Sequence, residues 1–173
     1  MPIPQETRPI WTNSADKYVP PVEGEYNRAT RPGDKAFESD QATLWRWRDD
    51  FQNDFAARMD WTIKPFAEAN HPPVPVLEHP DRLTVKSGQR LDFAAQPSYD
   101  PDGDSLSFYW FHYPEAGSWP ELVPISQPQN TIDAWAMAPK VDKPETLNFI
   151  LRVRDKGTPP LTRYKRVIVT VEP

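Results

Sequence analysis

The sequence predicts a mainly β protein: an immunoglobulin-like antiparallel β-sandwich preceded by a proline-rich segment and one amphipathic α-helix. The chain has 173 residues and contains 22 prolines, a content that interrupts long helices and favours short strands joined by turns. Segments of alternating apolar and polar residues recur through the C-terminal part of the chain. Roughly 100 residues in about seven strands is the size of an immunoglobulin-like sandwich.

The strand predicted over residues 105–113 has aromatic side chains on both of its faces. Two largely aromatic faces are typical of a central strand of a sandwich rather than of an edge strand. Trp110 lies in the middle of this strand, and we expect it to fill the core between the sheets. The other strands are expected, from the same alternation, at residues 74–77, 83–85, 89–94, 123–132, 146–155 and 163–171.

A helix is predicted over about residues 39–60, with Ser39 as its N-cap. Trp45 and Trp61 lie off its apolar stripe, so the helix carries bulky groups on more than one side and needs partners on more than one side. We expect these partners to be the rest of a larger domain or a second copy of the chain. The stripe itself consists of Leu44, Trp47, Phe51, Phe55 and Met59.

We place a domain boundary at the proline-rich connector that begins with Asn70. Residues 1–69, an irregular segment and the helix, form one part of the chain. Residues 70–173 form the sandwich. His71 and His79 flank prolines near the boundary, and we expect them to lie far from any carboxylate cluster.

Composition excludes several classes of function. The chain contains no cysteine, so it has neither disulfides nor thiolate metal ligands. Its net charge is −5 and its basic residues are dispersed, which argues against a nucleic-acid partner. It has no apolar run of the length that spans a membrane. The N-terminal residues lack the apolar core of a signal peptide, so the protein is either cytoplasmic or part of a longer secreted chain, and we favour the second interpretation.

The acidic turn before the aromatic strand has two interpretations. Asp100, Asp102 and Asp104 alternate around Gly103, so their carboxylates could converge on one calcium ion. The glutamate that would close a twelve-residue calcium loop is absent, because position 111 is phenylalanine. The alternative is a turn held by side-chain hydrogen bonds to the backbone, which requires no cofactor.

Aromatic residues near the strand ends are candidates for sugar binding, because planar rings stack on the apolar faces of pyranose rings. Tyr113, Trp119 and Trp135 are the candidate platforms, with His112 and Glu115 as polar contacts. The competing interpretation is simple loop packing.

No candidate catalytic residue emerges from the sequence. Glu115 and Glu121 bracket Trp119 as a pair of carboxylates could in a glycosidase, but we favour the interpretation that they are solvated loop charges. The chain contains no glycine-rich phosphate loop, metalloprotease helix or nucleophile elbow.

Several motifs resemble one bacterial family, that of cellulose-binding proteins with a nucleoside-hydrolase-like domain. They are IWTNS at 10–14, QATLWRWR at 41–48, FQNDFAARMDW at 51–61, NHPP at 70–73, DPDGD at 100–104 and GTPPLTRY at 157–164. The resemblance implies a larger secreted or periplasmic protein, in which residues 1 to about 66 close the N-terminal domain. The aspartate cluster that binds calcium in true nucleoside hydrolases has no equivalent in this chain.

The sequence therefore indicates a non-catalytic module that binds cellulose-like polysaccharide. The alternative is a structural or dimerising C-terminal part of a nucleoside-hydrolase-like, glycoside-cleaving enzyme that is inactive by itself. The implied partners are a polysaccharide and, through the helix, the N-terminal domain or a second copy.

Overall fold

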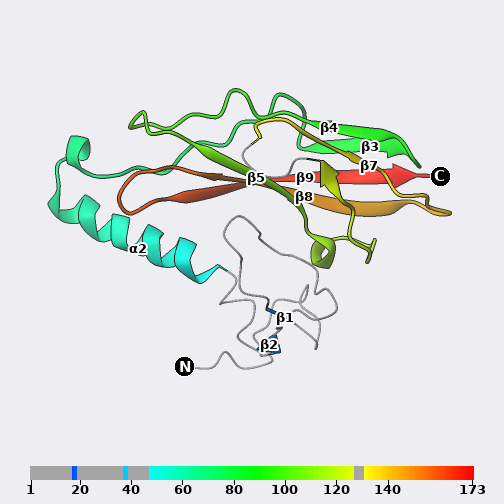
Figure 1. The fold of residues 1–173 in the computed structure, drawn as a ribbon, viewed down its shortest axis with the longest axis horizontal. Helices are drawn as coiled ribbons and strands as arrows, with labels where there is room; N and C mark the ends of the chain where they lie inside the picture. The colour runs from blue at the N-terminus through cyan, green and yellow to red at the C-terminus, as the bar shows by residue number, and fades with distance from the viewer. Residues whose placement is uncertain (1–16, 19–36, 39–46, 127–130) are drawn as a thin grey trace.

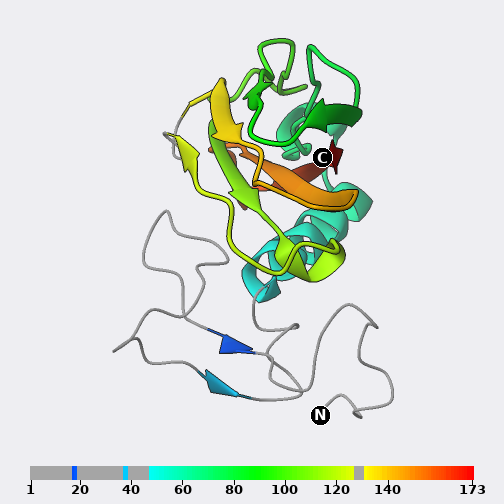
Figure 2. The ribbon, with the colours of Figure 1, turned by 90° about the vertical axis from the view of Figure 1, so that its right-hand side faces the viewer.

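The computed structural model describes residues 17–18, 37–38, 47–126 and 131–173. Two β-sheets pack face to face, and helix α2 (Arg48–Ile63) lies on the far side of the larger sheet (Figures 1 and 2). The fold is thus a β-sandwich with one described α-helix, as the sequence predicts. No helix in the described ranges is long and apolar enough to span a membrane.

The larger sheet has four strands in the order β3-β9-β8-β5. The smaller sheet has the order β4-β7-β6, and β1 pairs with β2 in a separate two-stranded ribbon. The strands are β1 (Lys17–Tyr18), β2 (Phe37–Glu38), β3 (Arg82–Lys86), β4 (Arg90–Phe93), β5 (Ser107–His112), β6 (Ile125–Ser126), β7 (Ala134–Met137), β8 (Glu145–Arg154) and β9 (Thr162–Glu172).

The core lies between the two sheets and is centred on Trp110, which is fully buried. The Trp110 ring stacks on Phe93 at 5.1 Å between centroids, and Phe93 contacts Phe149 at 4.8 Å. Burial alternates along β4 and along the C-terminal half of β9, because successive side chains point to opposite faces of a strand, whereas β8 is largely buried on both faces. The prediction that Trp110 is a core residue is confirmed.

Three features of the sheets differ from the sequence-based expectation. Strand β5 lies at the edge of its sheet rather than in the centre. Strand β3 pairs with β9 in parallel, so one pair departs from an antiparallel sandwich. Strand β7 was not expected at Ala134–Met137, and the expected strand at 74–77 is reduced to a single bridge between Val74 and Tyr99.

The edge position of β5 has a physical explanation. Its aromatic pattern reports burial on both faces, not the number of hydrogen-bonded neighbours. One face packs into the core, and Phe111 on the other face lies 6.4 Å from the ring of Trp47, which immediately precedes α2. The residue that leads into the helix therefore helps to cover the second face of β5.

Helix α2 (Arg48–Ile63) packs on the sandwich through its polar side, not through its apolar stripe. Asp50 and Ala57 are buried, whereas the stripe from Phe51 onward faces solvent and Ile63 is 79% exposed. The expected residues 39–46 lie outside the described ranges. The exposed stripe, continued by the 3-10 helix η2 (Phe66–Glu68), consists of Phe51, Phe55, Met59, Ile63 and Phe66.

The connector after α2 is tied to the loop of the β8–β9 hairpin. Trp61 donates its indole N–H to the carbonyl of Asn70 at 2.8 Å. The Asn70 amide donates to the Asp155 carboxylate at 3.2 Å and to the Pro159 carbonyl at 2.8 Å. A Cβ atom at Gly157 would overlap the side-chain amide of Asn70, so only glycine fits there without displacement. Contacts thus cross the boundary that we place at residue 70.

We expect Gly157→Ala to lower the free energy of unfolding by about 1–3 kcal/mol, because the new methyl group must displace Asn70 from its hydrogen bonds. Lys156→Ala is the matched control, since Lys156 is exposed and a surface substitution costs within about 0.5 kcal/mol. Urea unfolding of both variants provides the measurement. Equal stability of the two variants would contradict the close approach of the Asn70 side chain to Gly157.

Candidate functional site

The acidic turn before β5 is held by its own backbone. The carboxylate of Asp100 accepts hydrogen bonds from the backbone N–H of Asp102 at 2.9 Å and of Asp104 at 3.1 Å. Gly103 adopts φ +81°, the left-handed conformation that this turn requires. The geometry is that of an Asx turn.

The turn does not gather its three carboxylates around one point. Asp102 instead faces His71, whose Nδ1 lies 2.9 Å from a carboxylate oxygen. Among the described residues, no group of three or more His, Cys, Asp or Glu side chains could hold a metal ion. The structure therefore gives no support to a calcium site at Asp100, Asp102 and Asp104. The expectation that His71 lies far from these carboxylates is wrong, because the connector runs beside the turn.

Two of the expected sugar-contacting residues are buried. His112 is 2% exposed and packs against Phe149 at 5.2 Å between ring centroids. Tyr113 is also buried, and its ring lies 6.4 Å from that of Trp47. Their expected role as surface contacts at a strand end is not supported. His112 points into the core between the sheets, whereas Trp47, the residue preceding α2, covers Tyr113 on the other face.

The loop after β5 folds back onto the start of β8. Ser118 donates its backbone N–H to the carbonyl of Thr146 at 3.0 Å, and Trp119 packs partly buried against the core. Glu115 lies half-buried in the 3-10 helix η3 (Pro114–Ala116). Trp119 and Glu115 therefore contribute to the fold of this loop.

Trp135 is the predicted platform residue that the structure places on an open surface. It lies on β7, is 39% exposed, and the guanidinium carbon of Arg90 lies over its ring at 4.7 Å from the centroid. Asp92 stands opposite Trp135 in the β4–β7 register and pairs with Arg90 at 2.7 Å. Met137 is exposed on the same strand. These residues make the outer face of the smaller sheet an aromatic surface flanked by two charges.

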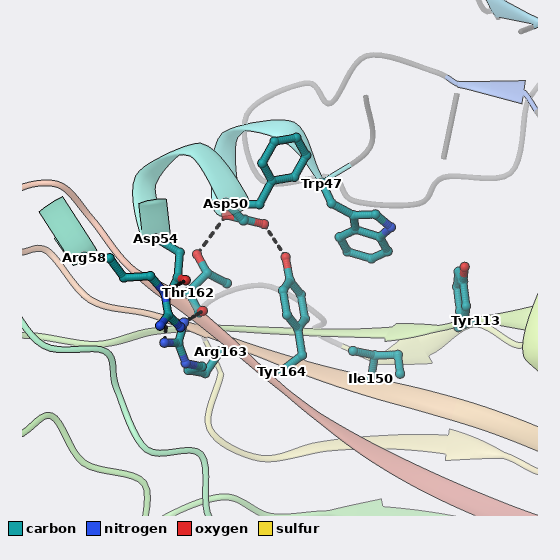
Figure 3. Close-up of a pocket in the computed structure, with 10 residues that line it drawn as sticks. Trp47, Asp50, Asp54, Arg58, Tyr113, Ile150, Thr162, Arg163 and Tyr164 are labelled. Atoms are coloured by element: carbon teal, nitrogen blue, oxygen red, sulfur yellow. Dashed lines mark hydrogen bonds and ion pairs between the residues drawn. The ribbon is translucent and has the colours of Figure 1, made fainter. Parts of the chain in front are cut away.

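A pocket of about 550 Å³ opens between α2 and strands β8 and β9 (Figure 3). The pocket is bounded mainly by apolar and aromatic groups. Its charged and hydroxyl groups come from both the helix and β9. The residues that line it are Trp47, Asp50, Phe51, Asp54, Arg58, Tyr113, Ile150, Thr162, Arg163 and Tyr164.

The polar groups of this pocket pair with one another. Asp50 accepts hydrogen bonds from the hydroxyl of Thr162 at 2.9 Å and from that of Tyr164. Asp54 forms ion pairs with Arg163 at 2.8 Å and with Arg58 at 2.7 Å. Burial by itself raises the pKa of Asp54, but the hydrogen bonds and charges of the two arginines outweigh burial and lower it.

Sequence reasoning did not find this pocket. Its residues come from positions 47–58, 113, 150 and 162–164, which no local motif links. The sequence offers one partial indication of the pocket, the run Thr162-Arg163-Tyr164. It provides a hydroxyl, a guanidinium and a phenol group at consecutive positions at the start of β9. Only the packing of α2 shows where these groups meet the helix.

These features define a β-sandwich domain with aromatic surfaces bordered by charged and hydroxyl groups, a combination suited to sugar rings. Residues 90–171 match the family described as "Cellulose-binding protein Sde0182, C-terminal domain". This part of the chain is thus similar to that family.

A solved structure shares both sequence and fold with the chain. It is a nucleoside hydrolase-related hypothetical protein from Saccharophagus degradans, described as associated with carbohydrate metabolism, with 37% identity and a TM-score of 0.71. The match covers 79% of this chain and 33% of that protein, so the chain spans one third of its length.

Other matches are distant. A 2,6-sialyltransferase from Photobacterium sp. JT-ISH-224 shares 14% identity over 53% of this chain and 17% of its own, with a TM-score of 0.39. Domains 4 and 5 of the S-layer protein SbsC share 18% identity over 58% of this chain and 48% of their own, with a TM-score of 0.32. No curated protein matches the chain.

Burial of His112 predicts a pH dependence of stability. Its Nδ1 accepts the backbone N–H of Val123 at 3.2 Å, and burial lowers its pKa from 6.5 to about 4. Between these values the unfolded chain binds a proton that the folded chain does not. The free energy of unfolding therefore falls as the pH is lowered from 6.5 to about 4, by up to about 3 kcal/mol from this residue.

The measurement is urea unfolding across this pH range for the wild type and for His112→Gln, in which residue 112 does not titrate. We expect the free energy of unfolding of the variant to fall less steeply than that of the wild type as the pH is lowered, because the contribution of His112 is absent. The comparison is needed because burial raises the pKa of Asp155, which acts in the opposite direction. Parallel profiles for the two proteins would show that His112 titrates normally in the fold.

Proposed function

We propose that this chain is a non-catalytic module that binds cellulose-like polysaccharide in a secreted or periplasmic bacterial protein. The observation that carries the proposal is the position of Trp135 on the open face of the smaller sheet. The match to a cellulose-binding protein family and the carbohydrate-associated solved relative support the ligand class. The same family supports a location outside the cytoplasm.

The physical basis of binding is a sugar ring stacked on the indole. A β-sheet presents its outward side chains in one plane, so a long chain can lie along the surface without bending. Arg90, held by Asp92, stacks on the ring of Trp135 on this outer face and fixes its orientation. Less side-chain freedom is then lost when the sugar binds. Arg90 and Asp92 also offer hydrogen bonds to hydroxyl groups.

The environment of the most deeply buried acid supports a non-catalytic role. Asp155 has a raised pKa, chiefly because it is buried, and such a shift is often a sign of a functional site. Its carboxylate, however, accepts hydrogen bonds from the backbone N–H groups of Gly157 and Leu161 and from the amide of Asn70. Asp155 thereby holds the β8–β9 loop, which is a structural task.

We expect Trp135→Ala to weaken binding to insoluble cellulose by about tenfold or more, since loss of a central aromatic contact costs about 2 kcal/mol. A pull-down with increasing amounts of cellulose measures the bound fraction. Met137→Ala is the control, because it removes an exposed apolar side chain from the same strand without removing a ring. Absence of the wild-type chain from the pellet would refute the proposal.

A second candidate function is that of an interaction part of a larger protein, and the exposed stripe favours it. Five large apolar side chains in one row on α2 and η2 form a patch of the kind that marks protein interfaces. The partner would be a nucleoside-hydrolase-like domain or a second copy of the chain. The solved relative, three times as long as the matched part, is consistent with the former.

Replacing Phe55 and Ile63 together by aspartate is expected to abolish association through the stripe, because a buried unpaired charge is strongly unfavourable at an interface. The molar mass of the wild type and of the double variant is measured by light scattering, alone and mixed with the separately expressed nucleoside-hydrolase-like part of the relative. Both side chains are exposed, so the fold should not change. If the wild type associates with neither partner, this second function fails.

A further inference from the structure

The pocket between α2 and the larger sheet lies on the opposite side of the sandwich from Trp135, so it is independent of the aromatic face proposed above. Its volume of about 550 Å³ falls in the range of small-molecule sites, about 300–1,000 Å³. It is half-open, and side chains from α2, β8 and β9 contribute to its walls (Figure 3). A pocket of this size can enclose one or two sugar units but not the middle of an extended polymer.

The walls present aromatic rings at angles to one another. Trp47 meets Tyr164 edge-on at 5.2 Å and 81°, and Tyr113 at 6.4 Å and 68°. Figure 3 shows Ile150 between the two tyrosines, with Trp47 above them. Rings that meet edge-on form a corner of apolar surface, against which a compact ligand can pack on more than one of its sides. A flat sheet face cannot do so.

The charges of the pocket cancel. Asp50 and Asp54 contribute two negative charges, and Arg58 and Arg163 contribute two positive charges. Both carboxylates are already paired with groups of the protein, so the pocket has no excess charge to attract a phosphate or a cation. A neutral ligand fits this balance best.

The polar groups are also held in place before a ligand arrives. Asp50 orients the hydroxyls of Thr162 and Tyr164, and Asp54 orients the two guanidinium groups. The hydroxyl oxygen of Thr162 has a second lone pair and a guanidinium group has five N–H donors, so these groups retain hydrogen-bonding capacity toward ligand hydroxyls. Preorganised donors and acceptors beside aromatic walls match a ligand with apolar ring faces and hydroxyl groups at its edge.

From this geometry we infer that the pocket formed by Trp47, Tyr113, Ile150 and Tyr164 is a second binding site, which takes a neutral saccharide unit at the end of a soluble oligosaccharide. The outer face of the smaller sheet would bind along insoluble chains, and the pocket would capture free ends. The two sites lie on opposite sheets and act separately.

The test is isothermal titration calorimetry of the 173-residue chain with cellotetraose. We expect saturable binding that Ile150→Trp and Trp47→Ala each weaken at least tenfold, the first by filling the pocket and the second by removing a wall. Trp135→Ala should leave this binding unchanged while it reduces retention on insoluble cellulose, so failure of one site is distinguishable from failure of the other. Circular dichroism establishes that each variant is folded.

A second readout does not depend on the variants. In the wild type, titration with cellotetraose should shift the NMR signal of the Ile150 methyl group, because Ile150 lines the pocket. Saturable binding that leaves this signal and the Ile150→Trp affinity unchanged would overturn the inference. Lack of saturable binding, or its loss on Trp135→Ala alone, would overturn it as well.

Discussion

The carboxylate of Asp50 joins α2 to β9. This contact fixes which side of the helix faces the larger sheet and which side faces solvent. Asp50 is buried and accepts hydrogen bonds from Thr162 and Tyr164. Hydrogen bonds to a charged group contribute about 1.5–3 kcal/mol each, and leaving such a group buried without them would be costly. The contact therefore orients the helix with its polar side inward. Its apolar stripe must then face outward.

Because α2 packs with its polar side inward, the segment around it covers part of the outer face of the larger sheet. Trp47 lies over the outer aromatic face of β5, so that Tyr113 and Phe111 become buried although β5 is an edge strand. The same placement creates the pocket beside Ile150 and Tyr164. The outer face of the smaller sheet receives no such cover at Trp135 and Met137, which stay exposed. The two sides of the sandwich consequently differ in shape, one hollowed and one open.

Local pattern predicted those parts of the fold that depend on neighbouring residues. The alternation in β4 and in the C-terminal half of β9, the core position of Trp110 and the turn at Gly103 follow from strand periodicity and backbone sterics. Prediction failed where distant segments meet. The pairing of His71 with Asp102 and the burial of Tyr113 depend on how the connector and α2 pack.

By itself, the sequence determined the class of fold and the core position of Trp110, because periodicity and composition act within short segments. Only the tertiary structure decided which aromatic residues remain accessible. Exposure is a property of what packs against a side chain, and for Trp135, Tyr113 and Trp47 the packing segments lie far away in the sequence. The pocket is the clearest case, since residues more than 100 positions apart, such as Asp50 and Thr162, build it together.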